Sequence, residues 1–229
     1  MKCWLFLILL VPASAETLHY VINWPSGLSL GEATLDSGKT EPGKVEPGKT
    51  EQTVWHFGFD LDASVPGFAI RDKYQSKASG PELCSTELVK TVQRGSRKSE
   101  ETDTFDLAAH SVTRQTKAPG GKSEYSVPSC ARDALAFLQF ARNELAGGRL
   151  APQQTVVLGG AYNVRLEFSG METVKSNGKP VQADRIQTTI KGPASAFTIQ
   201  VLFAHDAART PILARIPLSL GTFTVELTH

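Results

Sequence analysis

Apolar and polar residues alternate with a period of two along most of the chain, which is typical of β-strands with one buried face. The clearest runs are Val164, Leu166 and Phe168, and Ile199, Val201 and Phe203. Turn sequences separate such runs at residues 25–27, 177–178 and 192–193. The pattern predicts about ten to twelve strands, joined mostly by hairpins.

One segment, residues 130–148, departs from this pattern and has the period of a helix. Its apolar positions are Ala134, Leu135, Phe137, Leu138, Ala141 and Leu145. We expect Ser129 to cap the first turn, Asp133 to complement the positive helix end, and the Gly147-Gly148 pair to end the helix. Arg132, Arg142 and Glu144 are expected to face solvent. Since the apolar face needs cover, we expect it to pack on the sheet.

Together these features predict a mainly β protein. The expected architecture is a single, strongly curved antiparallel sheet, a half-barrel or open barrel, with one main helix packed against it. The length of 229 residues suits one domain with one substantial core.

An aromatic stripe marks one predicted strand, where Trp55, Phe57 and Phe59 share a face while His56 and Gly58 take the other. Two interpretations stay open for the stripe. It is either part of a filled core or the lining of an apolar cavity, together with Leu135 and Leu138 of the helix.

Two segments fall outside the strand pattern. The unit EPGK occurs twice within residues 37–52, and its Pro-Gly pairs and polar composition predict a flexible insertion.

The amino terminus has the order of a cleavable secretory signal: Lys2, then an apolar run from Trp4 to Val11, then Ala13-Ser14-Ala15. We therefore expect residues 1–15 to be a signal peptide and residues 16–229 to form one domain, periplasmic or secreted, with no membrane span; an uncleaved anchor is the alternative.

The net charge and the spacing of the histidines argue against a nucleic-acid partner and against a metal or other cofactor. Without Lys2, 23 basic residues face 23 acidic ones, so the net charge is zero and we expect no nucleic-acid partner. The five histidines are never spaced as metal ligands on a strand or helix, so we expect neither a metal nor another cofactor.

Two cysteines remain after signal cleavage, Cys84 and Cys130, and in an oxidising compartment they most simply form a disulfide. The alternative is a reactive thiol at Cys130, because a helix amino terminus lowers the pKa of a nearby cysteine.

Three segments resemble the exported bacterial domain-of-unknown-function family 3108. They are the hairpin ending in Phe105-Asp106, the helix from Asp133 to Arg142 followed by Gly147-Gly148, and the closing stretch with Asp206, Arg209, Pro211, Gly221, Glu226 and Leu227. The resemblance implies export and a curved β-sheet similar to that of periplasmic lipoprotein carriers, with a helix on the concave side. It implies no activity.

No catalytic motif stands out. The G-x-S-x-G and H-E-x-x-H patterns and glycine-rich phosphate loops are absent from the sequence, and we predict no catalytic residue. Asp206 and Arg209 are expected to form a structural ion pair before Pro211, with contact to a ligand as the alternative.

The sequence thus favours a non-catalytic protein that binds or carries a lipid or other apolar ligand. The alternative is an envelope scaffold with a filled core that binds a partner protein, and a hydrolase is the third hypothesis.

Overall fold

The computed structural model describes residues 15–40, 53–65, 67–117 and 120–228. The expected signal peptide therefore lies outside the described residues except for Ala15, which begins the first strand. Of the expected insertion at residues 37–52, the first four residues belong to the second strand and the remainder, with both EPGK units, lies outside the described residues.

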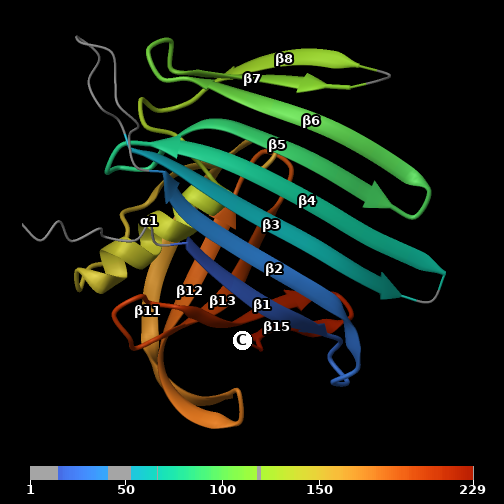
Figure 1. The fold of residues 1–229 in the computed structure, drawn as a ribbon, viewed down its shortest axis with the longest axis vertical. Coiled ribbons are helices and arrows are strands. Elements are labelled where there is room, and N and C mark those ends of the chain that lie inside the picture. The colour runs from blue at the N-terminus through green and yellow to red at the C-terminus, as the bar shows by residue number, and fades with distance from the viewer. Residues whose placement is uncertain (1–14, 41–52, 66, 118–119, 229) are drawn as a thin grey trace, which may run out of the picture.

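Fifteen strands and one helix make up the described fold (Figure 1). The first eight strands are β1 (Ala15–Asn23), β2 (Ser29–Thr40), β3 (Val54–Val65), β4 (Phe68–Ser79), β5 (Cys84–Arg94), β6 (Arg97–Asp106), β7 (Ser111–Thr116) and β8 (Gly121–Ser126). There follow β9 (Arg132–Asp133), α1 (Ala134–Ala146), β10 (Gln154–Val157), β11 (Ala161–Ser176), β12 (Lys179–Lys191), β13 (Ala196–Ala204), β14 (Pro211–Leu218) and β15 (Gly221–Leu227).

All fifteen strands form one sheet, in the order β8-β7-β6-β5-β4-β3-β2-β1-β15-β14-β13-β12-β11-β10-β9. Neighbouring strands are antiparallel except for β9 and β10. The predicted class, one open and mainly antiparallel sheet with one helix, is confirmed, but the predicted strand number was too low. Elements such as β9, with two residues, and β10, with four, are too short to display the alternation that marks a strand in sequence.

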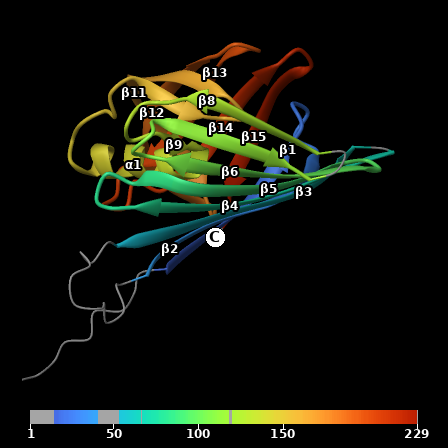
Figure 2. The same ribbon diagram turned by 90° about the horizontal axis from the view of Figure 1, so that it is seen from above.

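The sheet curls so strongly that its two ends approach each other, with α1 on the concave side (Figure 2). The Ser85 amide of β5 donates to the carbonyl of Ala131, just before β9, at 3.0 Å. We call this junction between β5 and the β9 end of the sheet the seam, formed by Cys84, Ser85, Cys130, Ala131 and Asp133. The seam matters because it holds the start of α1 inside the curved sheet.

The helix begins one residue after Asp133, which is its N-cap: a carboxylate oxygen accepts the amides of Leu135 and Ala136 at 2.8 and 3.2 Å. The prediction that Ser129 caps the helix was wrong, because the chain from Cys130 to Asp133 first runs along the seam and then as β9. The helix ends at Gly147, as predicted.

The helix is more deeply enclosed than its sequence suggests. Ala136, Phe137, Phe140, Ala141 and Leu145 are buried in the main core against β3, β11 and β12. The expectation that Arg132 and Arg142 face solvent was wrong, since both are buried and bonded on the concave side, whereas Ala134 is exposed.

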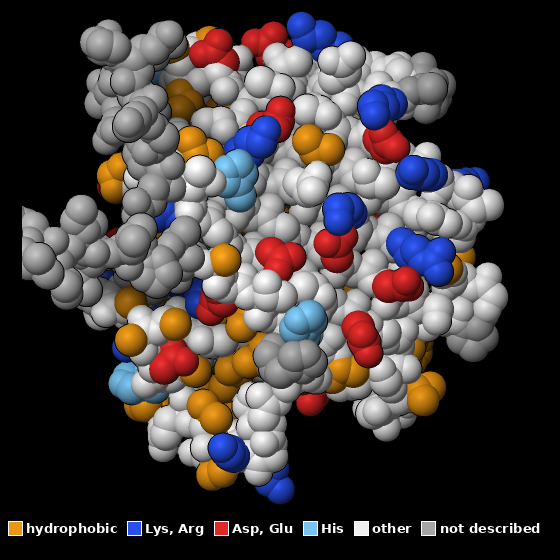
Figure 3. All heavy atoms as spheres, viewed as in Figure 1, with side chains coloured by type: hydrophobic (Ala, Val, Ile, Leu, Met, Phe, Trp, Pro, Cys, Tyr) orange, Lys and Arg blue, Asp and Glu red, His pale blue; other side chains and the backbone are white. Residues whose placement is uncertain are grey.

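The outer face of β3–β5 is polar. Charged side chains of both signs are spread over it (Figure 3). Exposed pairs such as Arg71–Asp62, Lys73–Asp60 and Lys77–Glu87 join neighbouring strands there.

Within the described residues, no helix is both long and apolar enough to cross a membrane.

Candidate functional site

A cavity of about 540 Å³ lies between α1 and the concave face of the sheet. Side chains from β1–β5, from α1 and from β10–β15 line it, so residues at both ends of the sequence meet there. Its volume falls in the range of about 300 to 1,000 Å³ that is usual for small-molecule sites.

The apolar wall of the cavity follows from the alternation seen in sequence. Ile199 and Val201 of β13 face the cavity and lie opposite Thr188 and Ile186 of β12. Ala214 of β14 pairs in turn with Val201. Because side chains on one face recur every second residue, the long hairpins of the second half of the chain present a continuous apolar surface to the interior.

Of the five residues predicted to bind a ligand, three line this cavity: Phe59, Leu135 and Leu138. The other two, Trp55 and Phe57, stack on each other with ring centroids 6.1 Å apart and pack against the α1 core instead. The stripe thus divides along the strand: its first two residues are core, and Phe59 faces the cavity.

Few polar groups face the interior. The Tyr20 hydroxyl donates to the carbonyl of Pro211 at 2.8 Å. Burial raises the pKa of Tyr20 above its ordinary value, and burial is also the main cause that raises the pKa of Tyr74. Both phenols are therefore neutral at physiological pH and add no charge to the cavity.

Lys90 of β5 is the cationic residue of the cavity wall. Its ammonium lies 2.8 Å from Glu101 and 3.3 Å from the buried Asp103 of β6. Arg114 of β7 binds Asp103 through two nitrogens, at 2.8 and 3.0 Å. Two cations thus face two anions, and the group has no net charge with which to select a charged ligand.

The same cluster also ties down the β10–β11 turn, because Arg114 donates to the carbonyl of Gly159 at 2.6 Å. Arg114 also lies over the ring of Tyr125, 5.7 Å from its centroid. Burial, chiefly, and the nearby Asp103 carboxylate raise the pKa of Tyr125 to about 12. This polar group braces one wall of the cavity.

Asp133 holds the start of the helix against the sheet. One carboxylate oxygen accepts the hydroxyls of Ser76 and Ser85, both at 2.6 Å, while the other caps α1. The Asp133 amide donates to Ser85 Oγ at 2.8 Å. Asp133 is fully buried, yet four hydrogen bonds satisfy its carboxylate.

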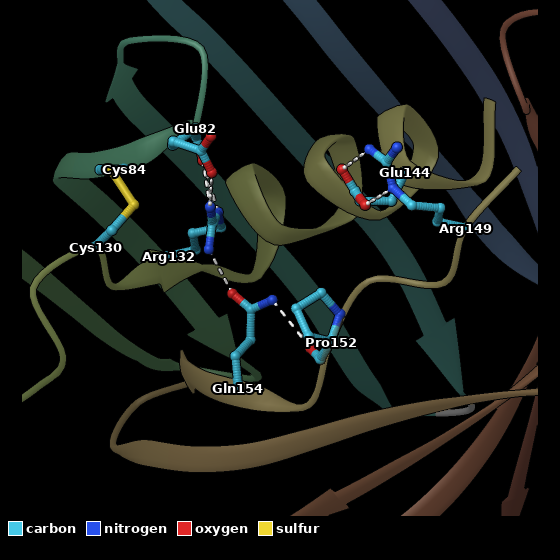
Figure 4. Close-up of polar contacts among 8 residues, drawn as sticks. All are labelled: Glu82, Cys84, Cys130, Arg132, Glu144, Arg149, Pro152 and Gln154. Carbon is cyan, nitrogen blue, oxygen red and sulfur yellow. Dashed lines mark hydrogen bonds and ion pairs between the residues drawn. A yellow bond between two sulfur atoms is a disulfide. The ribbon is translucent and has the colours of Figure 1, made fainter. Parts of the chain in front are cut away.

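A disulfide joins the two sides of the seam, and a buried arginine lies beside it (Figure 4). Cys84 and Cys130 are bonded, as predicted, so Cys130 is not a free thiol. Arg132 donates to the carbonyl of Glu82 at 2.8 and 2.5 Å and to the Gln154 side chain at 2.6 Å. Its guanidinium lies 3.7 Å from the centroid of the Phe140 ring, and burial lowers the pKa of Arg132.

The predicted ion pair between Asp206 and Arg209 was wrong. Arg209 instead binds Asp184 of β12, while Asp206 accepts the amide and hydroxyl of Thr210, both at 3.2 Å. The turn before Pro211 gives Arg209 a positive φ of 49°, and its guanidinium lies against β12. Each residue thus has a partner other than the predicted one.

Sequence reasoning missed Tyr20, Lys90 and most of the β12–β15 lining. The alternation of β13 and β14 contained the signal for the apolar lining, but not which strands would face each other across the interior. In the described part of the chain, no three His, Cys, Asp or Glu side chains gather as a metal site would require.

A family model described as "Protein of unknown function (DUF3108)" matches residues 17–228. No curated protein matches the sequence.

Among solved structures, the chain is similar to a β-barrel-like protein of the domain of unknown function DUF1849 from Brucella abortus. The two share 9% sequence identity over 93% of this chain and 94% of that chain, with a TM-score of 0.55. The Mycobacterium tuberculosis lipoprotein LppX aligns over 93% of this chain and 84% of its own, with 16% identity. Its TM-score of 0.28 is too low to establish a shared fold.

Proposed function

The chain belongs to the DUF3108 family, which is described as of unknown function, and we propose that it binds an apolar or lipid-like molecule without transforming it. The observation that carries the proposal is the cavity of about 540 Å³, whose walls are largely apolar. An elongated hydrocarbon would remove this surface from water, and burial of apolar area is the main source of affinity in such sites.

The polar groups of the wall support a neutral binding region. Tyr20 donates to Pro211, and Lys90 is offset by Glu101 and Asp103. Asp133, the other charged residue of the lining, already accepts four hydrogen bonds through its carboxylate. A charged group carried deep into the cavity would therefore lose its hydration without gaining a counter-charge that is not already engaged. We therefore expect an acyl or polyprenyl chain to occupy the interior, with any charged head group outside.

We further propose that the protein acts outside the reducing cytosol, in the periplasm or beyond, after cleavage behind Ala15. The Cys84–Cys130 disulfide supports this, since such bonds persist in oxidising compartments. Mass spectrometry of the protein from the culture supernatant and periplasm tests it. A mature chain that starts at Glu16 is the expected result, and an intact chain from Met1 would contradict it.

A fluorescent fatty-acid titration tests the binding proposal. Ala134 lines the cavity and is exposed, so Ala134→Trp fills space without displacing a buried side chain. We expect the variant to weaken probe binding by about tenfold or more.

The matched control is Ala146→Trp, at the exposed last residue of the same helix and outside the cavity lining. It should bind the probe as the parent protein does. No uptake of the probe by the parent protein, or equal loss in both variants, would contradict the proposal.

A further inference from the structure

Two neighbouring turns form an exposed apolar surface at one end of the curved sheet. They are residues 24–28, between β1 and β2, and residues 217–221, from the end of β14 to the start of β15; we call them together the apolar tip. Leu28, Leu218 and Leu220 are 68%, 57% and 67% exposed. They are three of the seven large apolar side chains that are exposed among the described residues.

The two turns are held together as one unit. Trp24 packs edge-on against Phe223, with ring centroids 4.8 Å apart, and Asn23 pairs with Thr224 in the sheet. Gly221 has a φ of +120°, and a Cβ there would lie 2.7 Å from Pro25 Cγ, so the turns touch where only glycine fits. The leucines are therefore presented by a braced surface.

Charge is missing from both turns and from the strand ends that lead to them. Residues 20–31 and 216–225 contain no Asp, Glu, Lys or Arg. The outer face of β3–β5, in contrast, is covered with paired charges. In Figure 3, hydrophobic side chains (orange) lie near the β1–β2 turn at the lower right. Single exposed leucines are common on proteins, but a charge-free group of three on adjacent turns marks an interaction surface.

Apolar side chains continue from the cavity to this surface. Tyr20, Ala214 and Val225 line the cavity. The next residues on the same face of these strands are Ile22, Ile216 and Phe223, as the pairs Ile22–Val225, Ala214–Val225 and Ile216–Phe223 require. Trp24 and Leu218 follow at the tip. An apolar track on one face of β1, β14 and β15 thus joins the cavity to the tip.

We propose that the apolar tip docks on the surface of a lipid bilayer, with Leu28, Leu218 and Leu220 entering the acyl region. A bilayer suits this surface better than a protein partner with a charged rim, because the tip offers no charge for complementary pairing. Trp24 lies next to the leucines, and tryptophan favours the boundary between head groups and acyl chains. The inference rests on the proposed function in one respect: the bilayer would be the source or destination of the apolar ligand.

Vesicle flotation with neutral phosphatidylcholine tests the proposal. The protein is expressed from its full-length gene, and all variants are compared with the same amino terminus. We expect Leu28→Ser with Leu218→Ser and Leu220→Ser to reduce partitioning by about 100-fold. The parent protein should bind equally at about 0.1 M and about 1 M salt, because no charge takes part.

A matched triple variant controls for the loss of exposed apolar area. Phe168, Met171 and Phe197 are 54%, 53% and 44% exposed and lie on β11 and β13, outside the tip. Replacing these three by Ser should change partitioning by less than about threefold, since they stay in water. Equal losses in both triple variants would overturn the proposal.

Tryptophan fluorescence locates the contact. With Trp55→Phe, Trp24 is the one tryptophan left in residues 15–229, and vesicles with brominated acyl chains should quench it. With Trp24→Phe, the remaining Trp55 packs on the α1 core and should not be quenched. Quenching of Trp55 alone, binding only to anionic vesicles at low salt, or self-association through the tip in place of vesicle binding would each overturn the proposal.

The fatty-acid titration separates this proposal from the proposed function. The tip triple variant should take up the probe like the parent protein, and Ala134→Trp should still bind vesicles. Vesicle binding without any probe uptake would leave the tip proposal standing and refute the cavity proposal, and the reverse result would do the opposite.

Discussion

The two ends of strand β1 lie in contrasting surroundings. At its start, Glu16 binds the buried Arg142 of α1 at 2.6 and 2.9 Å, and Arg142 also donates to the carbonyl of Ala208 at 3.1 Å. About 26 Å further along, at about 3.3 Å per residue, β1 leads into Trp24 and the charge-free tip. The start of β1 is thus fastened to α1 by ionic and hydrogen-bonded contacts, and its other end leads to exposed leucines.

This difference separates stability from binding. The helix and the seam close one end of the curved sheet with polar groups that are buried and satisfied, so that end is expected to carry much of the free energy of unfolding. The tip contributes little burial and is free to meet another surface. Substitutions at the two ends should therefore have distinct effects, large on stability at the helix end and small at the tip.

Loss of the disulfide should have the largest effect on stability. Cys84 and Cys130 are separated by 46 residues, and on the loop-entropy model replacing both by Ser costs about 4 kcal/mol. Urea denaturation of the double variant beside the parent protein measures it. A loss below about 1 kcal/mol would mean that the seam is held without the disulfide.

Asp133→Ala should come next, with a loss of about 3 kcal/mol, because it removes the helix cap and leaves two buried hydroxyls without their acceptor. Asp206 is a matched control, since it also accepts a backbone amide but is exposed. Asp206→Ala should cost less than about 1 kcal/mol in the same denaturation experiment. Equal costs would show that burial of the Asp133 network adds nothing.

Two arginines near the same helix sharpen the comparison further. Arg142 is buried and bonded to Glu16, whereas Arg149 binds Glu144 in solvent. Arg142→Met should cost about 2 kcal/mol, because the Glu16 carboxylate and the Ala208 carbonyl lose their donor. Arg149→Met should leave the melting temperature unchanged, and a comparable fall in both variants would contradict the assignment of Arg142 as a fastening residue.

The smallest predicted effect is the dependence on alkaline pH. Burial raises the pKa of Tyr20 above the ordinary 10.0, so above pH 10 the unfolded chain releases a proton that the folded chain keeps. Stability is therefore complete below pH 10 and falls as pH rises, by about 1 kcal/mol between about pH 10 and about pH 11. Tyr20→Phe should show a shallower fall over this window, and an unchanged slope would indicate that Tyr20 ionises freely.

Much of the fold could be predicted from local patterns. Alternation and turn sequences predicted the long hairpins, and Gly147 marked the end of the helix. The disulfide could be predicted because only two cysteines remain after the expected signal cleavage. The helix start could not be predicted, because Asp133 is a cap through partners, Ser76 and Ser85, that lie far away in sequence. Local signals made Ser129 equally suitable.

The site was harder to predict for the same reason. The stripe of Trp55, Phe57 and Phe59 has one face, but α1 covers only part of it, so the division between core and cavity depends on where the helix ends up. From the helical pattern alone, Arg142 is expected to face solvent. In the structure it is buried because the first strand places Glu16 beside it. Interactions between distant segments decided both outcomes.

Native mass spectrometry of the protein purified from the cells that naturally produce it, followed by organic extraction, tests the central claim most directly. We predict one apolar molecule per chain in the parent protein and in Ala146→Trp, with a reduced fraction in Ala134→Trp. A bare mass for the parent protein and no extractable lipid would contradict the assignment of the cavity as a ligand-binding site.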